Sequence, residues 1–502
     1  MPSGDITSTD NEENVEGLPP VPKEVHAKNR NKLVGRLKEV APNSVVLVQG
    51  GYLINHYNTD TVYQYRQESY FLWLFGVREP GFYGLVEVKT GKSVLFIPRL
   101  PEEYATWMGP IPTPAFVTEK YGVSETFYID QIDDVLSGLC PQSVLLLNGL
   151  NTDSNLEIKP ADFPNRSGLA VNTSTLYPII SECRVVKSPE EIELISKACA
   201  ISCTAHKYVM QAITKCNFEY QVESLFKNSC YFVGGSRTTA YTNNCSTGCN
   251  CSILHYGDAG APNSKQILPG DMCLFDMGAS HSGYASDITI SFPVSGKFTE
   301  EQKTIYEAVL GARDAVINSA RPGVSWVDMH ILANKVMLAK LTEAGILNGN
   351  VDEMIEAGLS GILQPHGLGH LLGIDVHDVG GYLSNTPQRP KQSYLKNLRT
   401  ARVLEEGIVL TIEPGCYFIE PLLDKALADE NLSKFINKDE ITKYRGFGGV
   451  RIEDVVVITK TGCIVLSPLP RSVEEIEAWM KQTDKGCLKP LDKHYQTPVI
   501  CK

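Results

Sequence analysis

The chain has 502 residues, enough for two to four domains, and its fractions of 43% hydrophobic and 21% charged residues are those of a soluble globular protein. A net charge of -12 with scattered Lys and Arg argues against a nucleic-acid or anionic-membrane partner, which would need a basic face. No apolar run approaches the roughly 18 residues of a spanning helix. The acidic N-terminus lacks a targeting signal, and the 14 cysteines lack a pairing rhythm. We therefore expect a cytoplasmic protein with reduced thiols.

The first part of the chain reads as an acidic tail followed by a mixed α/β domain. Residues 1–22 have the composition of a disordered segment. Residues 23–184 form the first predicted domain, with a helix over about 25–40 and a buried strand over 44–48. Further strand-like runs cover 70–75, 83–88, 93–97 and 143–147. We find no cluster of catalytic residue types in this domain.

A second domain is predicted over 185–485, with a tail over 486–502. Its first helix begins at Ser188-Pro189-Glu190-Glu191, because Ser can cap a helix and Pro and Glu suit its first turn. Further helices are predicted over about 219–233, 299–320 and 327–344. Strand pairs lie between and after these helices, so the pattern is typical of an α+β domain with helices packed on a curved sheet.

The stretch CLFDMGASHSGYASDITISF, residues 273–292, alternates with a period of two on both sides of a turn within 280–283. Asp276 and Asp287 therefore share one face. A two-residue loop at His281-Ser282 would set them directly opposite each other. Burial would force one of the pair to hold a proton, whereas a bound cation makes the pair favourable. The alternative is a hairpin whose Asp side chains point into solvent.

Three histidines lie in the glycine-rich segment QPHGLGHLLGIDVHD, residues 364–378. His366 and His370 have the spacing of a helical zinc pair, but Gly367 and Gly369 disfavour a helix and no Glu follows His366, so this is not a zincin. We interpret the glycines as allowing close approach of the backbone to a ligand. A structural role is the alternative for a single histidine, and the presence of His377 as a third favours a site.

Two apolar strands each carry a carboxylate. In GIVLTIEPG, residues 407–415, Glu413 stands just before a Pro-Gly stop. In GGVRIEDVVV, residues 448–457, Glu453 shares a face with Arg451. A Glu on an apolar strand is costly unless it is paired or binds a metal. The alternatives are a solvated strand end for Glu413 and an ordinary buried ion pair for Glu453.

The chain thus offers four carboxylates and one imidazole on strands or tight loops: Asp276, Asp287, His370, Glu413 and Glu453. Four carboxylates cannot all stay ionised in one pocket without cations, and two divalent ions about 3.5–4 Å apart would neutralise them. The oxygen-rich set favours Mn²⁺, although Co²⁺ or Zn²⁺ could bind. Such a pair would deliver hydroxide to a carbonyl carbon. Spacing alone does not prove that the five residues converge.

The motifs LFDMG with ASDIT, PHGLGHLLGIDVHD, TIEPG and GVRIED resemble, in this order, the metal-binding set of the pita-bread metallopeptidases, peptidase family M24. The resemblance is greatest to the prolidase group of that family, and it extends from RQESYFLWLFGVREPGFYG through ILHYGDAGAPN and LRTAR to RGFGGVRIED. It implies an N-terminal creatinase/prolidase-like domain of mixed α/β structure. A pita-bread (creatinase/aminopeptidase-like) catalytic domain of α+β class would follow.

Residue by residue, the resemblance implies that Asp276 binds one metal ion, that His370 and Glu413 bind the other, and that Asp287 and Glu453 bridge the two. Glu413 would also carry the proton of the attacking water. The family pattern has one acid more than Glu453-Asp454 at this point, and Glu453 fits the bridging position better.

The resemblance also implies residues that contact the substrate: His255, His377, Arg399 and Arg451, with His366 as a further catalytic imidazole. Arg suits planar bidentate contact with a terminal carboxylate, and His377 could support a developing oxyanion. Without the resemblance, Arg399 would be interpreted as a surface ion-pair residue. Trp107 corresponds to a loop that a partner subunit brings towards the active site, so a homodimer is expected.

The function implied is that of a binuclear, metal-dependent dipeptidase with two Mn²⁺ ions per subunit. It would hydrolyse Xaa-Pro and Xaa-hydroxyproline dipeptides by attack of a metal-bridging hydroxide and release proline. Two alternatives stay open. One is aminopeptidase P-type cleavage of longer Xaa-Pro peptides, and the other is a non-catalytic pita-bread protein that binds partners.

Overall fold

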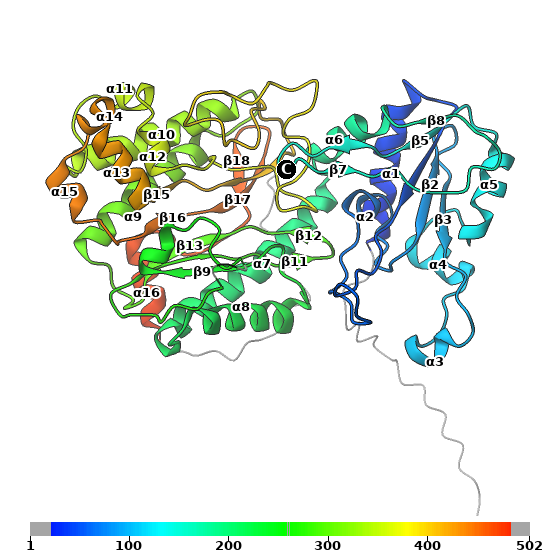
Figure 1. Cartoon of the computed structure of the whole chain (residues 1–502), viewed down its shortest axis with the longest axis horizontal. Coiled ribbons are helices and arrows are strands. Elements are labelled where there is room, and N and C mark those ends of the chain that lie inside the picture. The colour runs from blue at the N-terminus through cyan, green and yellow to red at the C-terminus, as the bar shows by residue number, and fades with distance from the viewer. Residues whose placement is uncertain (1–21, 259, 261, 483–502) are drawn as a thin grey trace, which may run out of the picture.

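The structure, a computed structural model, describes residues 22–258, 260 and 262–482. The predicted acidic tail, except residue 22, and the predicted C-terminal tail lie outside these residues. Figure 1 shows two lobes side by side, a smaller one built from the first part of the chain and a larger one built from the rest. None of the helices in the described part of the chain is long and apolar enough to cross a membrane.

The N-terminal lobe is built on a mixed six-stranded sheet of order β4-β3-β2-β1-β5-β8. Along β1, Val46 and Val48 join the core beneath α1 and α2, while Val45 and Leu47 join a second core beneath α5. Burial on both faces explains why the strand is an unbroken apolar run. The elements are α1 Lys23–Lys38, β1 Val45–Gln49, α2 Ser69–Phe75, β2 Tyr83–Glu87, β3 Ser93–Ile97, α3 Tyr104–Met108, α4 Pro114–Tyr121, β4 Glu125–Tyr128, η1 Ile129–Gln131, α5 Ile132–Leu139, β5 Val144–Leu146, β6 Gly149–Leu150, β7 Glu157–Ile158, β8 Val171–Asn172 and α6 Leu176–Val185.

One predicted strand of this lobe is wrong: residues 70–75 lie in helix α2, not in a strand. The Glu68 side chain accepts a hydrogen bond from the Phe71 backbone N–H at 2.7 Å and so begins the helix, and Gly76 ends it with φ 68°. Every residue from Tyr70 to Phe75 is buried, so the run shows neither helical nor strand periodicity.

The end of α2 is buried, and side chains of α1 satisfy its free carbonyl groups. His26 Nδ1 lies 3.1 Å from the Trp73 carbonyl oxygen, which also accepts from Asn29 at 3.0 Å. Arg30 donates to the Leu74 carbonyl oxygen at 2.8 Å. A buried carbonyl without a partner would cost free energy, so α1 and α2 are fixed to each other by these bonds.

The larger lobe combines helices with short antiparallel sheets, as predicted. The sheets are β13-β10-β9, β14-β17-β18, β15-β16 and β11-β12. The elements are α7 Pro189–Ala212, η2 Ile213–Lys215, α8 Glu219–Gly234, β9 Asn244–Thr247, η3 Gly248–Ser252, β10 Met272–Asp276, β11 Ser280–His281, β12 Tyr284–Ala285, β13 Thr289–Pro293, α9 Glu300–Ser319, α10 Trp326–Glu343, α11 Val351–Glu356, α12 Ser360–Leu363, β14 Val409–Ile412, β15 Gly415–Tyr417, α13 Glu420–Ala428, α14 Glu430–Ser433, α15 Lys438–Thr442, β16 Gly449–Arg451, β17 Asp454–Ile458, β18 Cys463–Val465 and α16 Val473–Lys481.

Buried polar contacts join the two lobes. Helix α7 begins at the predicted capping residue Ser188, and the buried Glu191 of its first turn accepts from Trp73 in the N-terminal lobe and from Tyr284 in β12. Close by, the fully buried Asp378 accepts from Arg184 and from Lys187, each at 2.7 Å. Removing one partner of such a buried pair is strongly destabilising. These pairs therefore hold the two lobes in one orientation relative to each other.

We predict that His26 makes the fold sensitive to acid. Burial lowers the pKa of His26 from 6.5 to about 4. The unfolded chain therefore binds this proton more readily than the folded chain, so the stability is complete above pH 6.5 and is lost as the pH falls towards 4. Between pH 7.5 and pH 5.0, His26 alone should contribute a loss of about 2 kcal/mol.

The measurement is urea unfolding of the wild type and of His26→Gln at both pH values. Gln keeps a side-chain donor for the Trp73 carbonyl group but does not titrate, so the variant should lose less stability on acidification than the wild type. An equal loss in both proteins would contradict the role of His26.

Candidate metal centre and active site

Asp276 and Asp287 lie on one hairpin, but the predicted register is wrong. Asp276 ends β10 and pairs with Thr289 of β13, and Asp287 lies in the segment just before β13. The two-residue turn is Ser282-Gly283, not His281-Ser282, because His281 pairs with Tyr284. Ser282 and Gly283 have φ values of 50° and 88°, as a type I′ turn requires, and Gly favours that second position.

The loop that carries His370 is bound to the edge of β14. The Thr411 backbone N–H donates to the His370 carbonyl oxygen at 2.9 Å, and that of Glu413 donates to the Leu368 carbonyl oxygen at 2.8 Å. A Cβ atom at Gly369 would lie 2.0 Å from the Thr411 carbonyl oxygen. This glycine thus permits close approach to a neighbouring strand, a constraint that the sequence did not indicate.

Glu453 lies at a break between β16 and β17, where hydrogen bonds to its backbone N–H and carbonyl groups hold it. Its N–H donates to the Thr289 carbonyl oxygen at 3.1 Å, and Arg471 donates to its carbonyl oxygen at 2.6 Å. The Thr289 hydroxyl donates to the Glu453 carboxylate at 2.6 Å. The neighbouring Asp454 pairs with Arg313 and Arg471 instead. Glu453, not Asp454, therefore faces the site.

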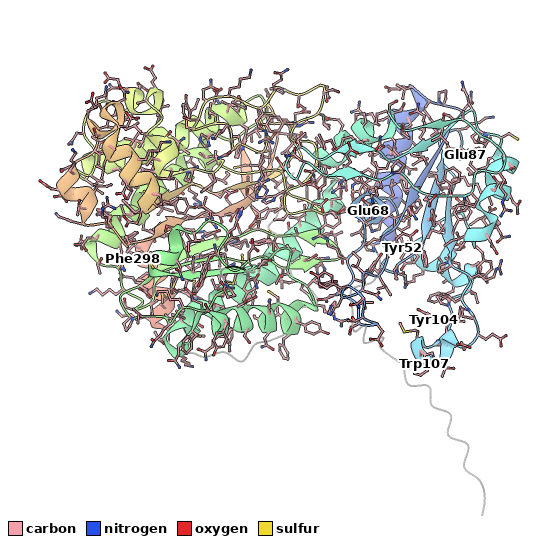
Figure 2. All side chains as sticks on the ribbon, in the orientation of Figure 1. Tyr52, Glu68, Glu87, Tyr104, Trp107 and Phe298 are labelled. Atoms are coloured by element: carbon pink, nitrogen blue, oxygen red, sulfur yellow. The ribbon has the colours of Figure 1, made fainter. Side chains whose placement is uncertain are left out.

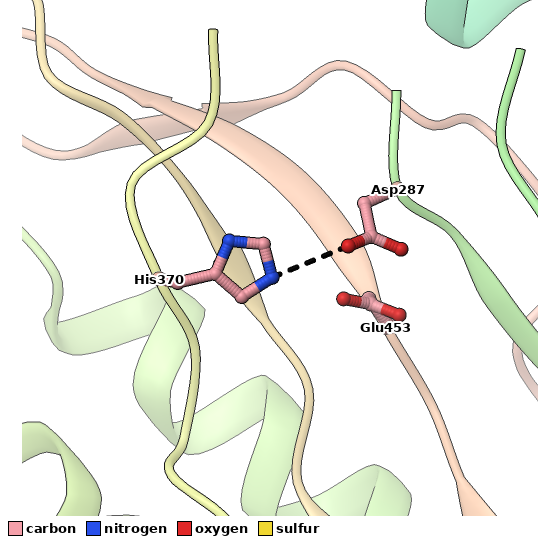
Figure 3. A group of neighbouring side chains, drawn as sticks. All are labelled: Asp287, His370 and Glu453. Atoms are coloured by element: carbon pink, nitrogen blue, oxygen red, sulfur yellow. Dashed lines mark ion pairs between the residues drawn. The ribbon is translucent and has the colours of Figure 1, made fainter. Parts of the chain in front are cut away.

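The five predicted ligand side chains line one cavity of about 660 Å³. Ligand atoms of Asp287, His370 and Glu453 lie within 4.8 Å of one another, with His370 Nε2 at 3.2 Å from Asp287 Oδ2 (Figure 3). Glu413 Oε1 lies 3.5 Å from the same nitrogen. A larger cavity of about 1080 Å³ is lined by none of these residues, so the donor atoms and not the volume identify the site.

Burial shapes the charges of this group. Burial raises the pKa of Glu413 to about 7, and it raises the pKa of Asp276 and, more strongly, that of Glu453. Burial also disfavours ionised Asp287, but its hydrogen bond to His370 and the charge of that imidazole hold the pKa of Asp287 below its usual value. Burial thus favours the protonated forms of Asp276, Glu413 and Glu453, whereas a nearby cation would favour their ionised forms.

The donor set fits divalent metal ions. It consists of carboxylate oxygens and one imidazole, which suit Mn²⁺ and related ions. A bound cation would also make the close approach of these buried carboxylates favourable rather than costly. His370 Nδ1 lies 3.0 Å from the Leu371 carbonyl oxygen. Donation of that N–H would leave Nε2 with its lone pair towards the acids, as a metal ligand requires.

Arg451 and Tyr241 contact Asp276, and Tyr417 contacts Arg451. Arg451 donates to Asp276 at 2.5 Å and to the Tyr417 hydroxyl at 2.8 Å, and the Tyr241 hydroxyl donates to Asp276 at 2.6 Å. Arg451 Nε also donates to Thr289 Oγ1 at 3.1 Å. Arg451 lines the cavity, but these bonds all go to protein groups, so its predicted contact with substrate stays a prediction.

The histidines expected near the substrate, His255, His366 and His377, line the same cavity, as does Arg399. His366 Nε2 lies 2.8 Å from the Tyr417 hydroxyl, and burial lowers the pKa of His366 to about 3. Burial, and then the charge of His370, lower the pKa of His377 to about 2. Both imidazoles are therefore neutral near pH 7.

Sequence reasoning missed several residues of this cavity. Tyr241 lines the cavity, and Tyr417 contacts the lining residues His366 and Arg451. Neither tyrosine carries a spacing signal, because their roles depend on segments that meet only in the fold. Thr152 and Asp153 come from the N-terminal lobe, in which the sequence showed no catalytic cluster. An isolated Asp in a polar turn could not have been distinguished from a solvated one.

Two family profiles match the chain. Residues 193–460 match the metallopeptidase family M24, and residues 26–145 match the aminopeptidase P N-terminal domain. These matches confirm the expected architecture, an N-terminal domain followed by a pita-bread catalytic domain.

Similar proteins agree with the profiles. The chain is 50% identical over 469 residues to a Xaa-Pro dipeptidase of Homo sapiens, covering 93% of this chain and 95% of that protein. It is 35% identical over 457 residues to a probable Xaa-Pro aminopeptidase of Verticillium alfalfae, covering 90% and 96%. A solved structure of zinc-substituted aminopeptidase P of E. coli in complex with product has a TM-score of 0.73 and 30% identity, covering 92% of this chain and 99% of that one. This chain therefore belongs to metallopeptidase family M24.

Proposed function

We propose that this protein is a dipeptidase that hydrolyses Xaa-Pro dipeptides, Xaa-hydroxyproline included, and releases proline. The observation that carries the proposal is the meeting of four carboxylates and His370 in one cavity that also contains Arg399. The identity of 50% to a Xaa-Pro dipeptidase supports the choice of substrate. A bond to proline lacks an N–H and has a rigid ring, so it needs dedicated positioning.

We infer that Asp276, Asp287, His370, Glu413 and Glu453 hold two divalent ions, Mn²⁺ by preference. Such ions, when bound, lower the pKa of water and polarise the substrate carbonyl group. The carboxylate of Glu413 accepts the proton of the attacking water and passes it to the prolyl nitrogen as the C–N bond breaks.

The remaining residues position the dipeptide. Neutral His377 donates an N–H to the carbonyl oxygen as negative charge develops on it. The Arg399 guanidinium forms a bidentate contact with the terminal carboxylate. His255 lies beside the proline ring. Neutral His366 is held by its hydrogen bond with Tyr417 on the side of the cavity where the substrate binds.

The first prediction from this proposal concerns activity and peptide length. Loaded with Mn²⁺, the protein should hydrolyse Gly-Pro, and a chelator should abolish this activity. A tripeptide such as Gly-Pro-Gly should be a poor substrate, because its carboxylate lies beyond the reach of Arg399. Proline release measured by chromatography tests this, and preferential cleavage of the tripeptide would favour the aminopeptidase P alternative.

The second prediction concerns Glu453. Glu453→Gln should lower metal content and should reduce kcat/KM for Gly-Pro by roughly 100-fold or more, because a neutral amide would hold a divalent cation less tightly than a carboxylate. Elemental analysis alongside the assay measures both quantities. The exposed Glu405→Gln variant is the control. Full metal content in Glu453→Gln, with low activity, would contradict the ligand role.

The third prediction concerns assembly and location. We propose that the protein is cytoplasmic, as its composition predicts. We also propose that it is a homodimer, supported by the exposed apolar end of α3, where Trp107 has 81% of its surface accessible (Figure 2). Sedimentation should give twice the mass of the chain. Trp107→Ser should weaken the dimer, because that aromatic surface would no longer be buried. A wild type that is monomeric at micromolar concentration would contradict this proposal.

A further inference from the structure

An acid of the N-terminal lobe forms part of the wall of the active-site cavity. Asp153 lies in the turn between β6 and β7, and it lines the cavity together with Arg389 and Arg399. The Asn151 side chain accepts from the backbone N–H groups of Asp153 and Ser154, each at 3.0 Å, which fixes the turn. The position of Asp153 is therefore determined before any substrate binds.

Asp153 lies between two arginines. Its Oδ1 accepts from Arg389 Nη2 at 2.7 Å, and its Oδ2 lies 3.4 Å from Arg399 Nη1. Arg389 is itself fixed, because it donates to the Leu398 carbonyl oxygen at 2.6 Å and lies over the Tyr382 ring at 4.3 Å. The shorter contact pairs Asp153 with Arg389 and leaves Arg399 the more weakly bound of the two cations.

The charges at this end of the cavity match a single carboxylate. Two guanidinium groups and the Asp153 carboxylate leave one positive charge, and the exposed Lys396 adds a solvent-screened one. The terminal carboxylate of a dipeptide would neutralise that charge. A tripeptide would bring a neutral peptide bond to the same place, and its next residue, about 3.3–3.6 Å long, would have to displace the Asp153–Arg389 pair.

We propose that Asp153 is a specificity-determining residue that closes the carboxylate end of the cavity and restricts the enzyme to dipeptides. The proposal rests on the dipeptidase function and adds a length filter supplied by the N-terminal lobe. With Arg389, Asp153 blocks the path beyond the proline, and its charge positions Arg399. Its removal opens this path and frees Arg389 to bind the carboxylate of a longer peptide.

The test compares Asp153→Ala with the wild type on Gly-Pro and Gly-Pro-Gly. The ratio of kcat/KM for the dipeptide to that for the tripeptide should fall by about tenfold or more in the variant. Asp130→Asn is the control, because Asp130 forms an exposed ion pair with Arg99 in the same lobe. Its ratio should equal that of the wild type.

A second variant distinguishes the positioning of Arg399 from a general loss of structure. Asp153→Asn keeps the size of the side chain but removes its charge, so the KM for Gly-Pro should rise about threefold or more. The KM for glycyl-prolinamide, which lacks the carboxylate, should not change. Metal content and unfolding temperature show whether each variant is folded. If Asp153→Ala does not fold, the result for Asp153→Asn tests the role of Asp153.

The outcomes separate this inference from the proposed function. If the metal-loaded wild type hydrolyses neither peptide, the dipeptidase function is wrong. If the wild type prefers Gly-Pro and Asp153→Ala keeps the ratio within twofold of that value, only the length filter is wrong. An equal rise in KM for Gly-Pro and for glycyl-prolinamide in Asp153→Asn would likewise overturn the role of Asp153.

Discussion

The gathering of buried carboxylates around His370 is the constraint on which the larger lobe depends. Two like charges 4 Å apart repel by about 4 kcal/mol at an effective dielectric constant of 20, and burial adds to that cost. The chain reduces the cost in two ways that its own atoms show. Arg451 and Tyr241 donate to Asp276, and His370 lies beside Asp287 and Glu413. The remaining negative charge is what a pair of cations would neutralise.

Such a group keeps its geometry only if the backbone beneath it is fixed. The segments of Glu413 and Glu453 are each bound through backbone hydrogen bonds, to the loop of His370 and to β13 respectively. Arg471 links the same elements, since it donates to the carbonyl oxygens of Thr289 and Glu453 and pairs with Asp454. Rigid strands and bonded loops therefore hold the ligands in place before a metal binds, which lowers the entropy cost of binding.

The candidate carboxylate ligands could be predicted from the sequence because each breaks a local rule, and His370 because it lies with two other histidines in a glycine-rich segment. A Glu such as Glu413 on an apolar strand, or an Asp pair on one hairpin face, is costly unless something compensates for it. The failures have equally local causes. The turn Ser282-Gly283 shifted the hairpin register, and the fully apolar run of α2 carried no periodicity. Tyr241 and Asp153 break no rule in sequence, and only the fold brings them to the cavity.

The dependence of the site on Asp153 gives the interface between the lobes a functional meaning. Asp153 can define the end of the cavity only if the N-terminal lobe keeps its orientation, and buried contacts with little freedom provide this. Glu191 accepts from groups in both lobes, and Asp378 holds Arg184 and Lys187 where the lobes meet. Such pairs add little net stability compared with apolar packing, but they are costly to break and specific in geometry. One apolar core continues from the N-terminal lobe into the larger lobe and supplies strength, while these buried polar pairs fix the orientation that a cavity wall shared between two lobes requires.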